Sequence, residues 1–154
     1  MKGKANVITA LNERLAEELG AISQYMVHAE MCVNWGYKGL GEHMEKIAKD
    51  EMRHAEMLIG RIIFLEGMPT VQRPAPIKIG ATVKEMIAND QAGEQDAAGL
   101  YNEVICLAVA EGDNGTREIV VKILQDEEGH TDWEEQQLTQ IEQMGLENYL
   151  TTQV

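Results

Sequence analysis

Two short motifs carry a glutamate and a histidine three residues apart, and a further glutamate precedes each motif at the same interval. Glu51 and His54 form the first motif, which follows Glu18. Residues three apart project from one face of a helix, so such a pair can hold one metal ion. The same spacing recurs in the second half of the chain with Glu94, Glu127 and His130.

One constant sequence offset relates the two sets, and it takes Glu18 to Glu94 and Glu51 to Glu127. It also maps Tyr25 onto Tyr101 and Asp50 onto Asp126. This self-similarity indicates that two helical hairpins each carry half of one site. A glutamate from each of two helices, with Glu-x-x-His from each of two others, is the ligand set of the two-metal carboxylate sites found inside four-helix bundles.

The ligand types favour iron or manganese. Hard carboxylate oxygens with one imidazole per metal suit these ions better than the sulfur-rich ligands preferred by copper(I) or structural zinc. We therefore predict a di-iron or di-manganese centre. The predicted assignment is Glu18 with His54 on one ion, Glu94 with His130 on the other, and Glu51 and Glu127 bridging the two.

A solvated acidic helix face is the competing interpretation, and for a lone Glu-x-x-His it is the usual one. Here the neighbouring positions on the same helical stripes are apolar, for example Met44, Ile47 and Leu58 around Glu51 and His54. Four carboxylates in one apolar core would be strongly unfavourable without cations or protons. The pattern therefore favours a buried metal site.

The length and charge of the chain limit the number of domains and the kinds of binding partner that we expect. The 154 residues fit a single domain, 1–154. With 26 acidic and 13 basic side chains, the net charge of −13 should repel nucleic acid and anionic lipid and attract cations. No apolar run suits a signal peptide or a membrane span, so we expect a cytoplasmic protein without a membrane partner. Cys32 and Cys106 stand alone, and we expect both to be small buried side chains.

Apolar residues recur at helical spacing throughout, and no segment alternates like a strand, so the predicted class is all-α. Thr82 with Glu85 forms a capping box at the start of one helix, and Asp113 or Asn114 can cap the next. The predicted helices run from about residue 7 to 35, from there to Gly67, from 82 to Gly112, from 113 or 114 to Gly145, and from 146 to about 153.

The segment from Gly67 to Ala81 contains all three prolines and is predicted to be an extended connection. At about 3.3 Å per residue, it spans roughly 50 Å, whereas the second helix is only about 40 Å long. It can therefore run the length of the bundle and make the second and third helices parallel. The predicted fold is a ferritin-like four-helix bundle with one long crossover and a short fifth C-terminal helix.

Several segments resemble bacterioferritins, and the resemblance covers essentially the whole chain. They are Met1–Gly3, Gln24–Tyr25, Asn34–Gly36, Phe64–Gly67, Asp126–His130 and Met144–Leu150. The resemblance implies iron storage in a homo-oligomeric shell of about twenty-four subunits built from two-fold dimers. It also implies that each bundle holds a ferroxidase centre, which oxidises Fe(II) with oxygen or peroxide, and that the six residues above are its ligands.

The resemblance further implies a haem b shared by two subunits, with Met52 as its axial ligand and a ferredoxin as a possible electron donor for iron release. Successive helical residues turn by about 100°, so Met52 should point about 130° away from the direction shared by Glu51 and His54, out of the bundle. A two-fold axis would bring a second Met52 to the other side of the haem. Without the resemblance, Met52 would be taken as a surface or interface methionine.

Several other residues have candidate roles. Tyr25 and Trp133 are candidate electron donors or simply packed aromatics. Asn34, Glu66 and Asp132 could line an iron pore between subunits or be ordinary solvated residues. Many bacterioferritins place a histidine where this chain has Lys46, so an inner-surface iron site beside Asp50 is not expected here. His28 and His43 receive no role.

Three other functions remain open at this point. A rubrerythrin-like di-iron peroxidase usually carries paired cysteines, which this chain lacks. A DNA-binding mini-ferritin shares its metal site between subunits and often has basic tails. A non-enzymatic helical interaction module would leave its acids solvated and would need no shell.

Overall fold

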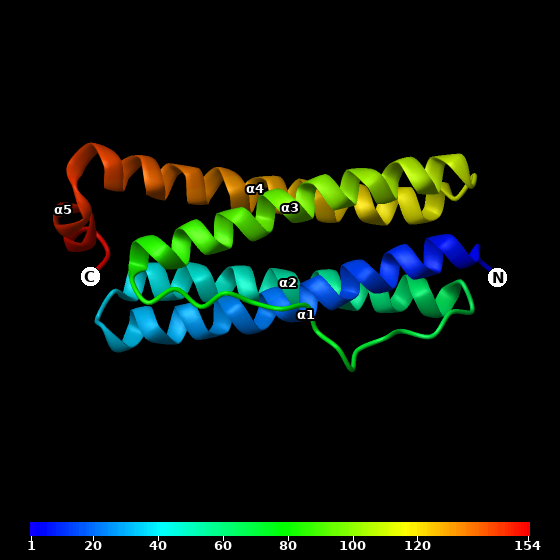
Figure 1. Cartoon of the computed structure of the whole chain (residues 1–154), viewed down its shortest axis with the longest axis horizontal. Coiled ribbons are helices and arrows are strands. Elements are labelled where there is room, and N and C mark those ends of the chain that lie inside the picture. The colour runs from blue at the N-terminus through cyan, green and yellow to red at the C-terminus, as the bar shows by residue number, and fades with distance from the viewer.

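Five helices make up the computed structural model, which describes residues 1–154 (Figure 1). There are no strands, and the predicted all-α bundle with a short C-terminal helix is confirmed. The helices are α1 (Ala5–Asn34), α2 (Lys38–Phe64), α3 (Val83–Ala110), α4 (Asn114–Met144) and α5 (Leu146–Thr151).

The two hairpins are built alike. α1 packs against α2 and α3 against α4, with further contacts between α1 and α3 and between α2 and α4. Each hairpin turn contains a glycine in the left-handed region, Gly36 with φ of +88° and Gly112 with φ of +69°. The offset that relates the two ligand sets also relates these glycines, so the repeat extends to the turns, where residues with a Cβ would be strained.

Side-chain caps mark the starts of both helices of the second hairpin, α3 and α4. The Thr82 hydroxyl accepts a hydrogen bond from the Glu85 backbone N–H at 3.2 Å, and Glu85 Oε2 accepts one from the Ala81 N–H at 2.9 Å. Asp113 accepts from the Thr116 N–H at 3.0 Å at the start of α4. Both predicted helix caps are confirmed, and each satisfies N–H groups that a helix start leaves free.

The crossover, residues 65–82, returns along the whole length of the bundle, as Figure 1 shows. α2 and α3 therefore run parallel, as predicted. The crossover is held against α1 by four hydrogen bonds that its backbone donates. Thr70 N–H donates to Asn12 Oδ1 at 2.7 Å and Ala75 N–H to Ala16 O at 2.8 Å. Lys78 N–H donates to Gln24 Oε1 at 2.9 Å and Gly80 N–H to His28 Nε2 at 3.0 Å.

The apolar core is split into two clusters at opposite ends of the bundle. On α2, the first cluster ends at Ala48 and the second begins at Ala55. The turns between them carry Glu51 and His54, which are buried although they are polar. The fold thus places a layer of ionisable side chains between two apolar clusters.

Cys32 is buried, as predicted, but Cys106 is exposed and that expectation was wrong. The buried face of α3 passes through Val104 and Ala108. A residue midway between them lies about 200° around the helix, so its side chain points to solvent. None of the helices combines the length and apolar character needed to cross a membrane.

Candidate metal centre

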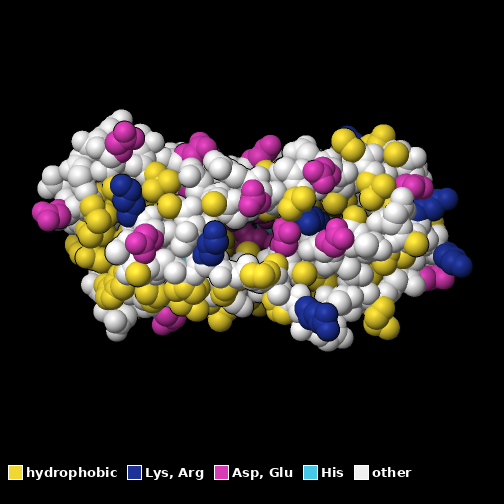
Figure 2. All heavy atoms as spheres, viewed as in Figure 1, with side chains coloured by type: hydrophobic (Ala, Val, Ile, Leu, Met, Phe, Trp, Pro, Cys, Tyr) yellow, Lys and Arg dark blue, Asp and Glu magenta, His cyan; other side chains and the backbone are white.

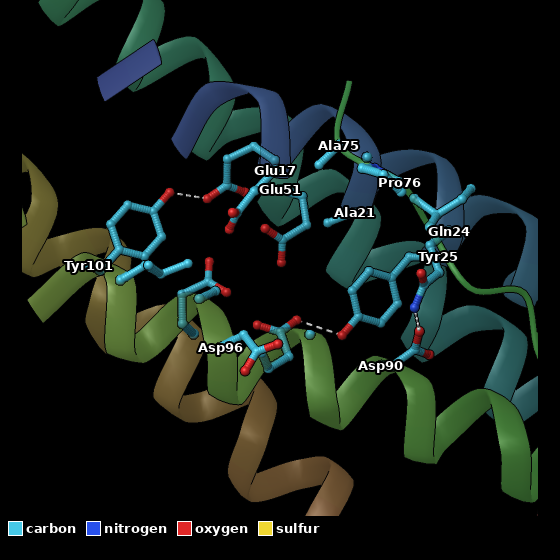
Figure 3. Close-up of a pocket in the computed structure, with 18 residues that line it drawn as sticks. Glu17, Ala21, Gln24, Tyr25, Glu51, Ala75, Pro76, Asp90, Asp96 and Tyr101 are labelled. Carbon is cyan, nitrogen blue, oxygen red and sulfur yellow. Dashed lines mark hydrogen bonds between the residues drawn. The ribbon is translucent and has the colours of Figure 1, made fainter. Parts of the chain in front are cut away.

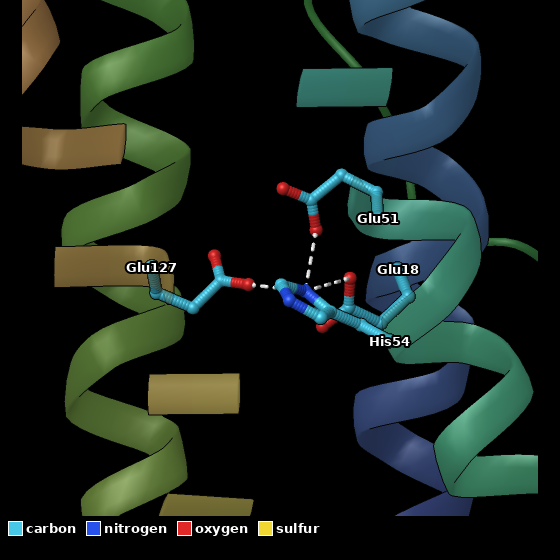
Figure 4. A group of neighbouring side chains, drawn as sticks. All are labelled: Glu18, Glu51, His54 and Glu127. Atoms are coloured by element: carbon cyan, nitrogen blue, oxygen red, sulfur yellow. Dashed lines mark hydrogen bonds and ion pairs between the residues drawn. The ribbon is translucent and has the colours of Figure 1, made fainter. Parts of the chain in front are cut away.

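The six residues predicted as ligands converge at the middle of the bundle, and all are buried. His130 is the most exposed of them, at 8%. They come from all four long helices. Their ligand atoms form two groups, each with its atoms within 4.8 Å of one another: Glu18, Glu51, His54 and Glu127 (Figure 4), and Glu51, Glu94, Glu127 and His130.

Glu51 and Glu127 belong to both groups. The Nδ1 atom of His54 lies 2.8 Å from Glu127 Oε1 and 3.3 Å from Glu51 Oε2. The Nδ1 atom of His130 lies 3.0 Å from Glu51 Oε1 and 3.4 Å from Glu94 Oε1. Both imidazoles therefore turn the same nitrogen toward the carboxylates, and the two shared glutamates lie where bridging ligands would be needed.

When no cation is bound, protons reduce the repulsion between the buried carboxylates of this cluster. Burial, reinforced by the neighbouring charge of Glu51, raises the pKa of both Glu18 and Glu127 well above the usual range. Burial also opposes ionisation of Glu51, but hydrogen bonds with Glu18 and the two histidines lower its pKa overall.

The histidines are biased toward the charged form. Burial by itself lowers the pKa of an imidazole, but contacts with the glutamates outweigh it here. Contacts with Glu127 and Glu18 raise the pKa of His54, and contacts with Glu51 and Glu94 raise the pKa of His130 to about 11. Metal ligands must be deprotonated, so a cation entering the cluster has to displace protons.

Five buried atoms of the cluster make no hydrogen bond. Glu127 Oε1 and Glu51 Oε1 lie 2.8 and 3.0 Å from imidazole nitrogens, but not in hydrogen-bonding geometry, and polar atoms buried in this way are costly. All five are atoms that bind metals, and two divalent cations would supply the missing partners. The unpaired atoms are Glu18 Oε2, Glu51 Oε1, Glu94 Oε2, Glu127 Oε1 and His130 Nδ1.

Behind each imidazole lies an aspartate from the opposite hairpin. His54 Nε2 is 2.9 Å from Asp126 Oδ2, and His130 Nε2 is 3.3 Å from Asp50 Oδ2. A carboxylate on the distal nitrogen fixes the orientation of a ligand histidine and raises its basicity. In the chain, Asp50 directly precedes Glu51 and Asp126 directly precedes Glu127. One turn of α2, and likewise one turn of α4, therefore supplies both a carboxylate of the cluster and the aspartate that contacts a histidine of the opposite hairpin.

Two tyrosines related by the same offset contact the cluster. Tyr101 donates to Glu18 Oε1, and the Tyr25 hydroxyl lies 2.5 Å from Glu94 Oε1 and 2.6 Å from Glu134 Oε1. Burial raises the pKa of both phenols, so each keeps its hydrogen.

The Tyr25 phenol has one hydrogen for two carboxyl neighbours. Burial, with the nearby charge of Glu94, raises the pKa of Glu134 to about 9, which keeps Glu134 protonated at neutral pH. Glu134 can then donate to the Tyr25 oxygen while Tyr25 donates to Glu94. Glu134 is fully buried, and sequence reasoning missed it. Glu134 follows His130 by four residues and so lies on the same helical face, and this spacing could have predicted that it is buried near the cluster.

Asp90 was also missed. It is buried on α3, accepts from Gln24 Nε2 at 2.7 Å, and contacts His28 Nδ1 at 2.9 Å. Because Gly80 N–H donates to His28 Nε2, the His28 hydrogen lies on Nδ1 and is donated to Asp90. This network ties the crossover to α1 and α3 and gives His28 a structural role.

A cavity of about 480 Å³ opens between α1, α3 and the crossover, and the four glutamates of the cluster line it. Glu17 and Asp96 also line it, and Ala75 and Pro76 of the crossover form part of its wall (Figure 3). Figure 2 shows acidic side chains in and around a hollow near the middle of this face. Neither histidine lines the cavity. Cations can thus reach the carboxylates from this side.

The remaining predicted residues lie away from the cluster. Met52 is 55% exposed on α2, which agrees with the outward direction expected from helical geometry. Trp133 stacks on His43 with ring centroids 3.9 Å apart. The proposed pore residues Asn34, Glu66 and Asp132 are exposed, as is Lys46.

Comparison with known proteins identifies the family. The family model described as "Ferritin-like domain" matches residues 8–144. The bacterioferritin of Brucella melitensis is 41% identical over 149 residues, which cover 97% of this chain and 92% of that protein. The bacterial ferritin of Synechocystis is 39% identical over 155 residues, covering 100% of this chain and 99% of that protein. The bacterioferritin of Rhodobacter capsulatus is 39% identical, with coverages of 97% and 92%. With this identity along nearly its whole length and a paired carboxylate and histidine cluster inside its four-helix bundle, the chain belongs to the bacterioferritin family of ferritin-like proteins.

Proposed function

We propose that this protein stores iron and oxidises Fe(II) to Fe(III) at the buried cluster. The observation that carries the proposal is a set of five buried atoms of metal-binding type that make no hydrogen bond, contributed by four glutamates and one histidine between the two apolar clusters. The names of the relatives, bacterioferritin and bacterial ferritin, support storage of iron. Both hairpins contribute ligands, so residues 1–154 act as one ferritin-like unit.

Fe(II) is the substrate, and the cavity between α1 and α3 is its proposed entry. Glu17 and Asp96 offer carboxylates in the cavity before the cluster is reached. At the cluster, Glu18 with His54 holds one ion, and Glu94 with His130 holds the other. The bridging ligands are Glu51 and Glu127.

The ligands favour the oxidised ions. Four carboxylates in a poorly hydrated site stabilise Fe(III) more than Fe(II), because the electrostatic attraction grows with the charge of the metal. Two Fe(II) ions supply two electrons, which are enough to reduce oxygen to peroxide or peroxide to water. Oxygen or peroxide is the proposed oxidant.

Storage requires a closed assembly. We propose a homo-oligomeric shell of about twenty-four subunits, built from two-fold dimers of chains of 17.2 kDa. The net charge of −13 suits a protein that attracts cations rather than nucleic acid.

Met52 is the proposed axial ligand of a haem b shared by two subunits. Its thioether is exposed on α2 and faces away from the metal cluster, so it is free to reach a group between subunits. One thioether supplies one axial position, and a two-fold axis would bring Met52 of a second copy to the other. The haem would supply a one-electron carrier, with a ferredoxin as the proposed donor for iron release.

Anaerobic titration of metal-free protein with Fe(II), followed by exposure to oxygen, tests the proposed reaction. We expect two Fe(II) bound tightly per chain and rapid oxidation of both. Light scattering should give a mass roughly twenty-four times that of one 17.2 kDa chain. A monomer or dimer, or a protein that binds no Fe(II), would contradict the storage function.

A further inference from the structure

Arg53 is the single side chain that contacts both aspartates behind the site histidines. Its Nη1 atom donates to Asp50 Oδ1 at 3.3 Å, and its Nη2 atom donates to Asp126 Oδ2 at 2.8 Å. Asp50 lies on the same helix, α2, whereas Asp126 lies on α4. The guanidinium therefore connects the two hairpins directly behind the metal cluster.

These contacts complete a chain that links the two imidazoles. His54 contacts Asp126, Arg53 joins Asp126 to Asp50, and Asp50 contacts His130. A guanidinium is planar and always charged, and its donors form a fork that can engage two carboxylates at once. A lysine ammonium is a point charge and lacks this geometry.

The repeat of the sequence is broken at this residue. The constant offset relates each ligand to a ligand of the same type, and Asp50 to Asp126, but it relates Arg53 to Gly129. A Cβ at Gly129 would have no neighbour within 4 Å, so the second half has room for a side chain there and carries none. One arginine thus serves both halves of the site.

Neither Arg53 nor either of the two aspartates that it contacts lines the cavity. Counted over side-chain atoms alone, exposure increases outward along the chain of contacts, from 0% for His54 and 9% for His130 to 22% for Asp50, 42% for Asp126 and 53% for Arg53. Exposed ion pairs add little to folding stability, so stability does not account for the arrangement. Without a partner, the side chains of Asp50 and Asp126 could rotate away from the histidines and into the solvent.

We propose that Arg53 is a positioning residue that couples the two metal positions. It holds Asp50 and Asp126, which in turn hold His130 and His54 with Nδ1 facing the carboxylates before any metal arrives. Loss of Arg53 therefore weakens both positions together. This inference rests on the proposed function, because it requires that the cluster binds two metal ions.

Titration of metal-free protein with Co(II) tests the coupling without relying on oxidation, because Co(II) reports both affinity and ligand geometry by its visible absorption. Removing a group that contacts a ligand directly typically costs about ten- to a hundredfold in affinity. Arg53 acts one contact further out, so we expect Arg53→Gln to weaken binding of both ions by about tenfold, the lower end of that range, and to alter the spectrum. Arg117→Gln is the matched control, since it removes the same charge from an exposed arginine that pairs with Glu118.

A second variant separates charge from geometry. Arg53→Lys keeps the charge but cannot engage both aspartates as a fork, so we expect its Co(II) affinity to remain below that of the wild type. The thermal midpoint of both metal-free variants should match the wild type. Wild-type Co(II) affinity and spectrum in Arg53→Gln, or full recovery in Arg53→Lys, would overturn the coupling.

The wild-type titration keeps this inference distinct from the proposed function. If the wild type takes up two Co(II) ions and Arg53→Gln does so equally well, only the role of Arg53 is wrong. If the wild type takes up none, the metal site itself is wrong.

Discussion

Glu51 and Glu127 lie on different helices, α2 and α4, yet each belongs to both groups of converging ligand atoms. Glu51 Oε1 and Glu127 Oε1 are both buried without a hydrogen bond. No other residue is shared by the two groups. Replacing either glutamate should therefore affect two ions rather than one.

Glu127→Ala is expected to abolish the rapid phase of Fe(II) oxidation, with a loss of rate greater than about tenfold, because both ions lose a ligand. Stopped-flow absorbance on mixing with oxygen measures the rate. Glu128→Ala is the matched control, since Glu128 is the next residue on α4 but is exposed. A wild-type rate in Glu127→Ala would exclude the bridging role.

Divalent ions should raise the thermal midpoint of the metal-free protein. Ions that bind only the folded state add about 2.7 kcal/mol per site at a hundredfold excess over Kd. The shift should grow as pH rises from 5 to 8, because the pKa of His130 is raised to about 11 and its proton has to leave before a metal can bind. Scanning calorimetry with and without Zn(II) measures the shift. Its absence at saturating Zn(II) would contradict a core site.

Glu134→Gln should change how the stability of metal-free protein depends on pH. The pKa of Glu134 is about 9 in the folded state, above its ordinary value of 4.5. The folded state therefore binds the proton more tightly, and this contribution is complete below pH 4.5 and lost as pH rises toward 9. The loss approaches about 1.4 kcal/mol per pH unit for a single group.

Glutamine keeps a donor toward Tyr25 but cannot ionise. The variant should therefore gain stability over the wild type as pH rises from 6 to 9, as measured by urea unfolding at several pH values. Glu135→Gln controls for the change in net charge, since Glu135 is exposed on the same helix. Parallel stability curves for Glu134→Gln and the wild type would show that Glu134 does not titrate in this range.

The fold was predictable because its signals are local. The glycines of the two hairpin turns, the Thr82 and Asp113 caps and the proline-containing crossover each follow from a few neighbouring residues. The convergence of the six predicted residues could be foreseen for a different reason. The two halves of the set repeat with one offset, so each half supports the interpretation of the other.

Features that depend on packing between distant segments could not be predicted. The cavity exists because the crossover passes α1 and α3 at Ala75 and Pro76. Glu134 has the sequence context of a solvated helix position, yet it is fully buried beside Tyr25. The double contact of Arg53 depends on Asp126, which is distant in the sequence and lies in the other hairpin. The opposite error was made for Cys106, which was expected to be buried because its side chain is small and apolar but which is exposed.

Met52 and Glu51 are neighbours in the chain, but their side chains have different surroundings. Glu51 is 1% exposed inside the cluster, whereas Met52 is 55% exposed outside it. Haem binding and iron oxidation can therefore be tested separately. Met52→Leu preserves approximate volume and helix propensity but removes the sulfur that would bind haem iron.

We expect the Met52→Leu shell to assemble normally and to oxidise Fe(II) with an intact rapid phase, yet to purify without the Soret band even when haem is supplied. Reductive release of stored iron should slow, because the proposed carrier from a ferredoxin would be missing. Met144→Leu is the control, since Met144 is also exposed but lies at the end of α4, away from Met52. A Met52→Leu protein that keeps a full complement of haem with an unchanged spectrum would place the haem ligand on another residue, because leucine offers no soft donor in place of the lost sulfur.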